Sequence, residues 1–264
     1  MDNPNRIVVT TGHKMKPAHI AEARELAARL SAPYAPRGNT SLDALRAEYG
    51  VPFVMVVKEK LAVATEDGEL YFHPGMAHLR LKNLRRGEGD HLAEALGLAA
   101  GMRVLDCTLG MGADAIVESF VAGETGEVVA LEANPVVALL IGRGLQSLTG
   151  EHPTTRAAMR RVKVIAADCL DYLRAQPEDS FDAVYFDPMF RHPFEDSAGI
   201  HPLRRLADPR PVSPEAVAEA CRVARRRVVL KESSRSLEFR RLGFGEFVGG
   251  KYSNVRYGVI RLQE

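Results

Sequence analysis

Residues 104–114 read Val-Leu-Asp-Cys-Thr-Leu-Gly-Met-Gly-Ala-Asp, an aliphatic run followed by a turn that contains two glycines. The aliphatic run favours a buried strand, and residues 114–122 favour a helix. Gly110 and Gly112 let the backbone of the turn approach a ligand closely, and the start of a helix presents unpaired N–H groups to that ligand. The stretch therefore predicts a strand–turn–helix unit that binds a ligand beyond the carboxyl end of its strand.

The same alternation of strand and helix continues along the chain. We expect strands at residues 103–106, 127–132, 162–166, 181–187 and 227–231. Helices are expected at 114–122, 135–148 and 169–174, with a further start at Ser213-Pro214. Regular alternation predicts an α/β fold, a doubly wound and mostly parallel sheet with helices on both faces. Residues 244–248 and 255–262 are expected to add a terminal strand pair.

The first part of the chain has a different pattern. We expect strands at residues 7–11, 53–57, 61–65 and 69–73, and helices at 17–30 and from Ser41 to about Tyr49. A basic stretch with Arg80, Lys82, Arg85 and Arg86 is interpreted as a link, with His73 and His78 packed between the two regions. The sequence thus predicts a small α+β domain over residues 1–80 and a larger domain over residues 90–264.

Composition excludes several classes of protein. The 264 residues are 46% hydrophobic and 26% charged, and 35 basic minus 34 acidic residues give a net charge of +1. This near-balance argues against a strongly basic nucleic-acid tail. No apolar run reaches the length of a membrane span, and the amino terminus lacks the pattern of a secretory signal. Three scattered cysteines and eight histidines without ligand spacing predict a cytoplasmic protein with no disulfide framework and no metal.

Two cofactor classes fit the glycine turn. Gly110-x-Gly112-x-x-Ala115 matches the dinucleotide fingerprint, and Glu132 follows at about the right distance, so an NAD-dependent oxidoreductase is one alternative. Asp106 and Asp114, however, would repel a pyrophosphate. They would attract S-adenosylmethionine (SAM), which carries a sulfonium and an ammonium group. The charges therefore favour SAM.

Two later strands also end in acids. Glu132 ends the second strand, where a carboxylate can accept both ribose hydroxyl hydrogens of a bound nucleoside. Asp168 follows the third strand. It is expected either to accept from the adenine amino group or to cap the helix that begins at Cys169, and both roles are open at this stage.

The fourth strand ends in Tyr185-Phe186-Asp187-Pro188-Met189-Phe190. An exocyclic amine needs acceptors that orient its NH₂ group, because its lone pair is delocalised into the ring. The Asp187 carboxylate and a backbone carbonyl at Asp187 or Pro188 suit this task, with Phe190 stacked on the ring. Lys231, at the end of the fifth strand, is expected either to face the target or a phosphate, or to be an ordinary surface lysine.

Residues 104–231 resemble the class I SAM-dependent methyltransferases. More narrowly, they resemble the bacterial family that methylates the N2 amine of a guanosine in small-subunit ribosomal RNA. The resemblance is carried by residues 73–80, 106–114, 131–138, 187–190 and 227–231. It implies a Rossmann-like fold and cofactor contacts at Ala113, Asp114, Glu132, Ala133, Asp168, Cys169 and Asp187. The family typically has an arginine where Ala113 stands and two serines where Asp168 and Cys169 stand.

Other substrates and surfaces remain as alternatives. The same amine chemistry suits DNA adenine or a protein glutamine, and a non-catalytic RNA-binding module is a third possibility. The amino-terminal region and the basic link are candidates for RNA docking. Four arginine clusters are interpreted either as a phosphate-binding rim or as an ordinary solvated surface: Arg160-Arg161, Arg204-Arg205, Arg225 to Arg227 and Arg240-Arg241.

Overall fold

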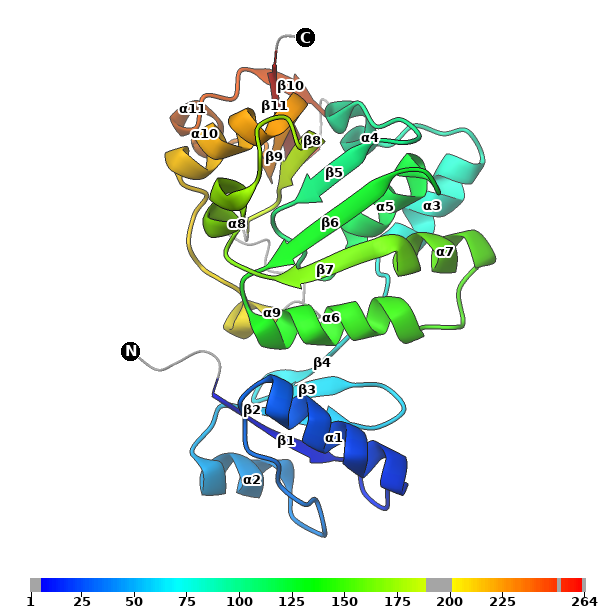
Figure 1. The fold of residues 1–264 in the computed structure, drawn as a ribbon, viewed down its shortest axis with the longest axis vertical. Helices are drawn as coiled ribbons and strands as arrows, with labels where there is room; N and C mark the ends of the chain where they lie inside the picture. The colour runs from blue at the N-terminus through cyan, green and yellow to red at the C-terminus, as the bar shows by residue number, and fades with distance from the viewer. Residues whose placement is uncertain (1–5, 189–200, 251–252, 263–264) are drawn as a thin grey trace.

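The structure is a computed structural model that describes residues 6–188, 201–250 and 253–262 (Figure 1). These residues form a four-stranded sheet in the order β1-β2-β3-β4 and a seven-stranded sheet in the order β10-β11-β9-β8-β5-β6-β7. Figure 1 shows the small sheet below the large one, with the chain passing from β4 up to α3. Among the described residues, no helix combines the length and the apolar character that crossing a bilayer requires.

The four-stranded sheet is built from the first part of the chain. Its elements are β1 (Ile7–Thr11), α1 (Pro17–Arg29), α2 (Leu42–Tyr49), β2 (Phe53–Val57), β3 (Ala62–Thr65) and β4 (Gly68–Tyr71). The strand β1 runs parallel to β2, whereas β3 and β4 continue the sheet antiparallel. Ser41 Oγ accepts from the backbone N–H of Ala44 at 3.0 Å and caps α2, as its position before the helix predicts.

The rest of the chain forms the larger sheet and its helices. The elements are α3 (Ala77–Arg85), α4 (His91–Leu96), β5 (Arg103–Asp106), α5 (Ala113–Ala122), β6 (Glu127–Glu132), α6 (Pro135–Ser147), α7 (Pro153–Arg161), β7 (Val162–Ala166), α8 (Cys169–Ala175), β8 (Phe181–Phe186), α9 (His201–Leu206), α10 (Pro214–Val223), β9 (Ala224–Ser233), α11 (Glu238–Arg241), β10 (Glu246–Val248) and β11 (Val255–Arg261). Strands β5 to β9 pair in parallel, and β11 and β10 pair antiparallel at one edge. The predicted doubly wound, mostly parallel α/β sheet is confirmed.

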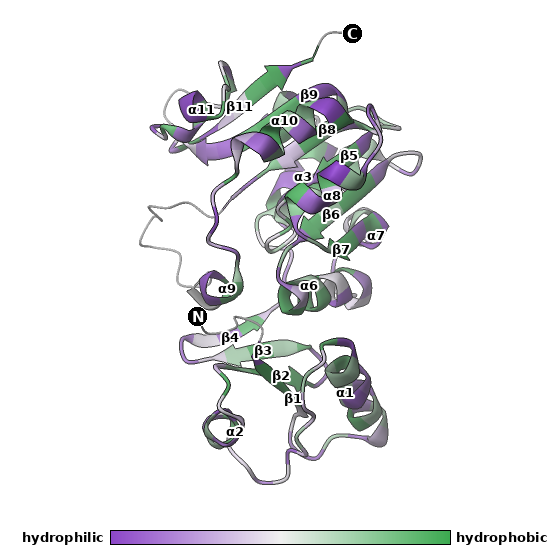
Figure 2. Cartoon of the chain, turned by 60° about the vertical axis from the view of Figure 1, so that its left-hand side comes forward, coloured by the Kyte–Doolittle hydropathy of each residue, from purple (hydrophilic) through white to green (hydrophobic). Residues whose placement is uncertain are grey.

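Helices cover both faces of this sheet because its strands are apolar on both faces. Val104 of β5 packs into the core under α5 and α6, and its neighbour Leu105 packs into the core under α8 and α10. Figure 2 shows these strands and the facing sides of the helices in green. The first core continues into the small sheet through Phe72. A Cβ atom on Gly144 of α6 would lie 2.1 Å from Phe72 Cβ, so glycine permits this contact.

Two expectations about the connection between the regions are wrong. The basic stretch interpreted as a link is the helix α3, whose Ala77 and Leu81 are buried as it packs on α5. His73 and His78 are exposed rather than packed between the regions, where Phe72 lies instead. The division into domains at residues 1–80 and 90–264 stays a prediction.

Candidate functional site

The parallel strands β5 to β9 end together at one edge of the large sheet, here called the carboxyl edge. It consists of Asp106 to Gly112, Glu132, Asp168, Asp187 and Lys231. Gly110 and Gly112 have φ values of +50° and +77°, which side chains with a Cβ atom rarely adopt. A Cβ atom on Gly112 would also lie 3.3 Å from Ile141 Cγ2. Glycine is therefore required here, and the turn exposes backbone rather than side chains to a ligand.

Asp106 ends β5 as a buried and only half-satisfied carboxylate, 1% exposed. Its Oδ1 accepts from the backbone N–H of Thr108 at 2.9 Å, and its buried Oδ2 has no hydrogen-bond partner among the described residues. Burial raises the pKa of Asp106 to about 8, and the nearby Asp114 and Asp187 carboxylates add to the increase. A cationic ligand would stabilise the ionised form of this carboxyl, so the residues present fit the ammonium or sulfonium of SAM.

Glu132 ends the neighbouring strand β6 and is 8% exposed. Its Oε1 accepts from the backbone N–H of Asn134 at 2.9 Å. Burial raises its pKa, although backbone N–H groups at Asn134 and Gly110 oppose the increase. The carboxylate is therefore fixed beside the glycine turn, next to the exposed Ala133, where an acceptor for ribose hydroxyls would stand.

Asp168 caps the next helix, so that alternative for this residue is confirmed. Its Oδ1 accepts from the N–H groups of Leu170 and Asp171, at 2.9 and 3.2 Å. Its Oδ2 accepts from Arg210 Nη2 at 2.6 Å, a partner that the sequence analysis did not identify. Cys169 is partly exposed beside it. Contacts of Asp168 and Cys169 with the cofactor stay a prediction.

Asp114, at the start of α5, is already neutralised. Its Oδ2 accepts from Tyr185 Oη and from Lys231 Nζ, both at 2.9 Å, and its Oδ1 pairs with Arg80. Burial alone would raise the pKa of Asp114, but Lys231 and Arg80 hold it below its usual range. The sequence analysis assigned Arg80 to a link because Arg80 and Asp114 are 34 positions apart, which hides their contact. A contact of Asp114 with the cofactor stays a prediction.

Asp187 and Pro188 follow β8 and are partly exposed at the carboxyl edge. The backbone N–H of Asp187 donates to Thr108 Oγ1 at 2.6 Å, which connects this turn to the turn after β5. Burial raises the pKa of Asp187 to about 6, while Lys231 opposes the increase. Phe190, the expected stacking residue, lies outside the described residues.

The interpretation of Lys231 as an ordinary surface lysine is wrong, because its ammonium forms ion pairs within the chain. That it faces the target or a phosphate stays a prediction. Its Nζ lies 2.7 Å from Asp187 Oδ2 and 2.9 Å from Asp114 Oδ2. Within the described ranges, no group of three or more His, Cys, Asp or Glu residues is placed to hold a metal ion.

The arginine clusters do not form one rim. Arg225 to Arg227 begin β9, at the end of the strand opposite Lys231, and Arg227 Nη1 donates to the carbonyls of Glu94 and Ala95. Arg205 pairs with Asp67, and Arg241 pairs with Glu238. The alternative of an ordinary surface therefore fits these clusters better than a phosphate-binding rim.

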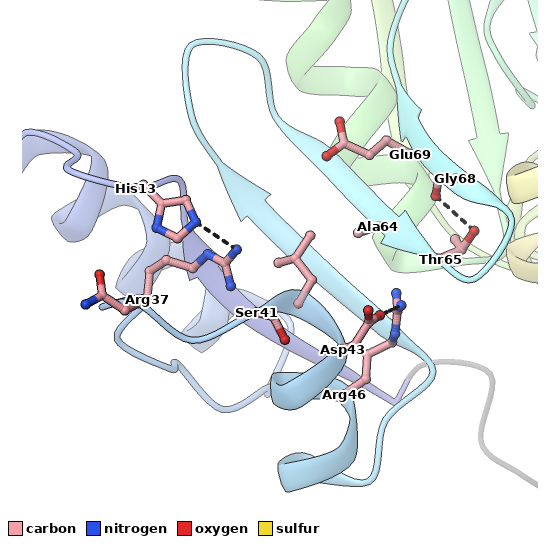
Figure 3. A pocket seen from close by; sticks show the side chains of 11 residues that line it. His13, Arg37, Ser41, Asp43, Arg46, Ala64, Thr65, Gly68 and Glu69 are labelled. Carbon is pink, nitrogen blue, oxygen red and sulfur yellow. Dashed lines mark hydrogen bonds and ion pairs between the residues drawn. The ribbon is translucent and has the colours of Figure 1, made fainter.

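A cavity of about 430 Å³ lies in the amino-terminal part of the chain (Figure 3). His13 and Arg37 point toward each other there, with Nε2 and Nη2 3.2 Å apart, and Arg46 pairs with Asp43. Its arginines are thus already partnered, and all its lining residues lie between His13 and Glu69. We assign no part of the site at the carboxyl edge to this cavity.

Comparisons with known proteins agree with this fold. A family model described as "Putative SAM-dependent methyltransferase" matches residues 53–241. The chain is 38% identical over 255 residues to the uncharacterized protein YpiP of Bacillus subtilis, covering 96% of this chain and 99% of that protein. It is 30% identical over 226 residues to the ribosomal RNA small subunit methyltransferase J of Coxiella burnetii, covering 81% and 83%. The crystal structure of a SAM-dependent methyltransferase from Neisseria gonorrhoeae has the same fold, with a TM-score of 0.64, 18% identity and coverages of 96% and 95%.

Proposed function

Since this chain belongs to the SAM-dependent methyltransferase family and uses SAM as its cofactor, we propose that it methylates an exocyclic amine of RNA, namely guanine N2 in small-subunit ribosomal RNA. The observation that carries the proposal is the pair of acids at the ends of two adjacent strands, the buried Asp106 and the partly exposed Asp187. They are connected through Thr108, which donates to one and accepts from the backbone N–H of the other. Asp106 suits the cationic methyl donor, and Asp187 suits the amine that accepts the methyl group.

We assign the cofactor to the first three strand ends. SAM, when bound, supplies an electrophilic methyl group on its sulfonium. Asp106 Oδ2 would face a positive group of the cofactor, and Glu132 would accept from the ribose hydroxyls. Backbone at Gly110, Gly112, Ala113 and Ala133 would contact the cofactor, with Asp168 and Cys169 on the adenine side. Asp114 would act indirectly, by holding Lys231.

Asp187 would orient the methyl acceptor. Its carboxylate and a backbone carbonyl at Asp187 or Pro188 accept the two N–H groups of the amine, and Phe190 stacks on the base. After transfer, the product amine loses a proton to Asp187 or to water. A base in structured RNA has to leave its stack to reach this edge. The similarity to the ribosomal RNA small subunit methyltransferase J of Coxiella burnetii supports ribosomal RNA as the substrate class.

Residues 1–80 are included in the proposal as an RNA-docking unit. Tyr71 of β4 is 41% exposed, and Lys60 Nζ lies 5.5 Å from the centre of its ring. An exposed aromatic ring next to a cation suits base stacking on single-stranded RNA. We expect Tyr71→Ala to weaken RNA binding about tenfold in filter binding, from the usual loss of one stacked base, and to leave SAM binding unchanged.

The function is tested by mass spectrometry of ribosomal RNA from cells with and without the gene. We expect N2-methylguanosine to be lost from small-subunit RNA at one site, and to be restored by the wild-type gene but not by Asp187→Ala. Purified protein with labelled SAM should methylate small subunits from the deletion strain. An unchanged RNA profile, together with labelling of DNA or of a protein glutamine instead, would replace the proposed substrate and keep the methyltransferase.

A further inference from the structure

Lys231 joins the candidate substrate acid to the candidate cofactor region. It lies near the end of β9, which pairs in parallel with β8 through Phe186 and Leu230. From this position its Nζ lies 2.7 Å from Asp187 Oδ2 and 2.9 Å from Asp114 Oδ2. The lysine side chain is 22% exposed and the Asp187 side chain 26%, so both remain accessible at the carboxyl edge.

The lysine is itself held in place by Asp114, which residues of three other elements anchor. Asp114 of α5 accepts from Tyr185 Oη on β8 and pairs with Arg80 on α3. Arg80 in turn donates to both oxygens of Asp90, at 2.7 and 2.8 Å, and Asp90 caps α4. An ammonium fixed by an anchored carboxylate keeps one position, which a surface lysine would not.

The charges around Asp187 require such a cation. Asp114 faces it from α5, Asp106 from β5, Tyr185 from β8 and Tyr257 from β11. Arg80 and Glu118 act on this group through Asp114. Lys231 on β9 is the cation that contacts Asp187 directly among these groups. Without it, the Asp114 and Asp187 carboxylates would face each other, and one would take up a proton.

We propose that Lys231 is a positioning residue for the methyl acceptor: it binds Asp187 Oδ2 and thereby holds the carboxylate ionised, with Oδ1 left for the amine N–H. This inference rests on the proposed role of Asp187. An ionised carboxylate accepts hydrogen bonds with both oxygens, whereas the protonated form loses part of that capacity. Lys231 therefore sets the pH range in which the amine is oriented, and it acts without touching the amine.

The test compares Lys231→Met and Lys231→Gln with Lys231→Arg, and uses Lys163→Met as a surface control on β7. Single-turnover rates on RNA are measured from pH 5 to 9, and ¹³C NMR follows the Asp187 carboxyl in cofactor-free protein. Because a carboxylate has to be ionised to accept, the wild-type rate should rise with pH through about 6, the pKa of Asp187. Loss of the ammonium should move the midpoint of the pH–rate profile and the midpoint of the NMR titration upward by about one to two pH units, the usual effect of a neighbouring charge.

At pH 7 the Met and Gln variants should therefore be about twofold slower than wild type for a shift of about one unit and about tenfold slower for a shift of about two units, with most of the rate recovered at pH 9. The Arg variant should keep its midpoint near that of wild type, and calorimetry should find SAM affinity within about threefold for all variants. Equal slowing of Lys231→Gln at every pH, with unmoved midpoints, would overturn the inference and leave Lys231 a structural residue. If the Met and Gln variants have the same pH–rate profiles as wild type, the inference about Lys231 is also overturned, while the proposed function remains. If no RNA amine is methylated, the proposed function fails, while the NMR midpoints still decide whether Lys231 controls Asp187.

Discussion

The two edges of the seven-stranded sheet carry the same residue types in opposite settings. At the amino edge, where β5 to β8 begin, Glu127 pairs with Arg103 and Lys163, and Asp182 Oδ2 accepts from the N–H of Arg103 at 2.7 Å. Arg103 and Lys163 are exposed and the two acids are partly exposed, and hydrogen bonds from Lys163 and Arg103 lower the pKa of Glu127. At the carboxyl edge, burial raises the pKa of Asp106, Glu132 and Asp187.

The comparison distinguishes acids that stabilise the fold through internal partners from acids that are available to bind a ligand. Acids at the amino edge have partners within the chain, so nothing remains for a ligand to supply. At the carboxyl edge, Asp106 keeps a buried oxygen without a partner in the described part of the chain, which costs stability in the free protein. Perturbed pKa values cluster at functional sites for this reason. Strands β6 and β8 each carry an acid at both ends, so the acid at the amino edge can serve as the control for the acid at the carboxyl edge.

The largest expected effect separates the two ends of β8. Asp187→Ala should reduce the single-turnover methylation rate about 10³-fold, the usual size of a lost orienting or proton-accepting group, with SAM affinity within about threefold. Asp182→Ala removes the same side chain from the amino edge and should leave the rate unchanged. Equal losses of rate in the two variants would show that Asp187 acts only through stability.

The next largest effect is expected for Asp106→Asn, which should weaken SAM binding but stabilise the cofactor-free protein. Asp106→Asn should weaken SAM binding about tenfold to a hundredfold, because an opposite charge is lost from a buried site. The pKa of Asp106 in the folded chain, about 8, lies above its unfolded value, so ionisation opposes folding. That penalty is absent below about pH 4 and increases as the pH rises toward 8.

Cofactor-free Asp106→Asn should therefore have a higher urea midpoint than wild type at pH 8, and the difference should narrow toward pH 4. Urea denaturation at several pH values checks the sign. A lower midpoint for the variant at pH 8 would contradict the assignment of Asp106 as a buried acid without an internal partner.

A smaller effect on SAM affinity is expected at β6, which has Glu132 at its carboxyl end and Glu127 at its amino end. Glu132→Gln keeps the size and one acceptor oxygen of the side chain, so SAM affinity should fall about tenfold, the equivalent of one weakened charge-assisted hydrogen bond. Glu127→Gln at the amino edge should not change the affinity. Calorimetry of the two variants makes the comparison, and equal affinities would remove Glu132 from the ribose site.

The smallest effect is expected at the amino edge itself. Lys163→Met removes an exposed pair with Glu127 and should change the free energy of unfolding by about 0.5 kcal/mol or less. The difference should vanish in about 1 M salt, where surface charges are screened. A salt-resistant loss of more than about 2 kcal/mol would show that this edge, too, holds a charge that the fold depends on.

Sequence patterns predicted the central strands well, because their apolar runs are short, bounded and buried on both faces. The capping residues Ser41 and Asp168 were predicted from local spacing, since a cap and its N–H partners lie within three residues. The helices α4 and α7 were missed: α4 has only six residues, and α7 is rich in polar and basic residues.

Contacts between distant residues could not be predicted in this way. Arg80 lies 34 residues before Asp114, and Lys231 lies 44 residues after Asp187, so no local pattern connects them. The sequence placed Asp106 and Asp187 correctly at strand ends and Asp114 at the start of a helix. It could not show that Asp114 is paired with Arg80 and Lys231, while Asp106 keeps an oxygen without a partner among the described residues.

The most direct test of the carboxyl edge is calorimetry of SAM binding to the wild-type protein between pH 6 and 8, in buffers of different ionisation enthalpy. We predict one SAM per chain, release of a proton on binding, and an affinity that increases as the pH rises toward 8, because the cofactor favours ionised Asp106. NAD should bind far more weakly. An affinity independent of pH and unchanged in Asp106→Asn, or tighter binding of NAD than of SAM, would contradict the account.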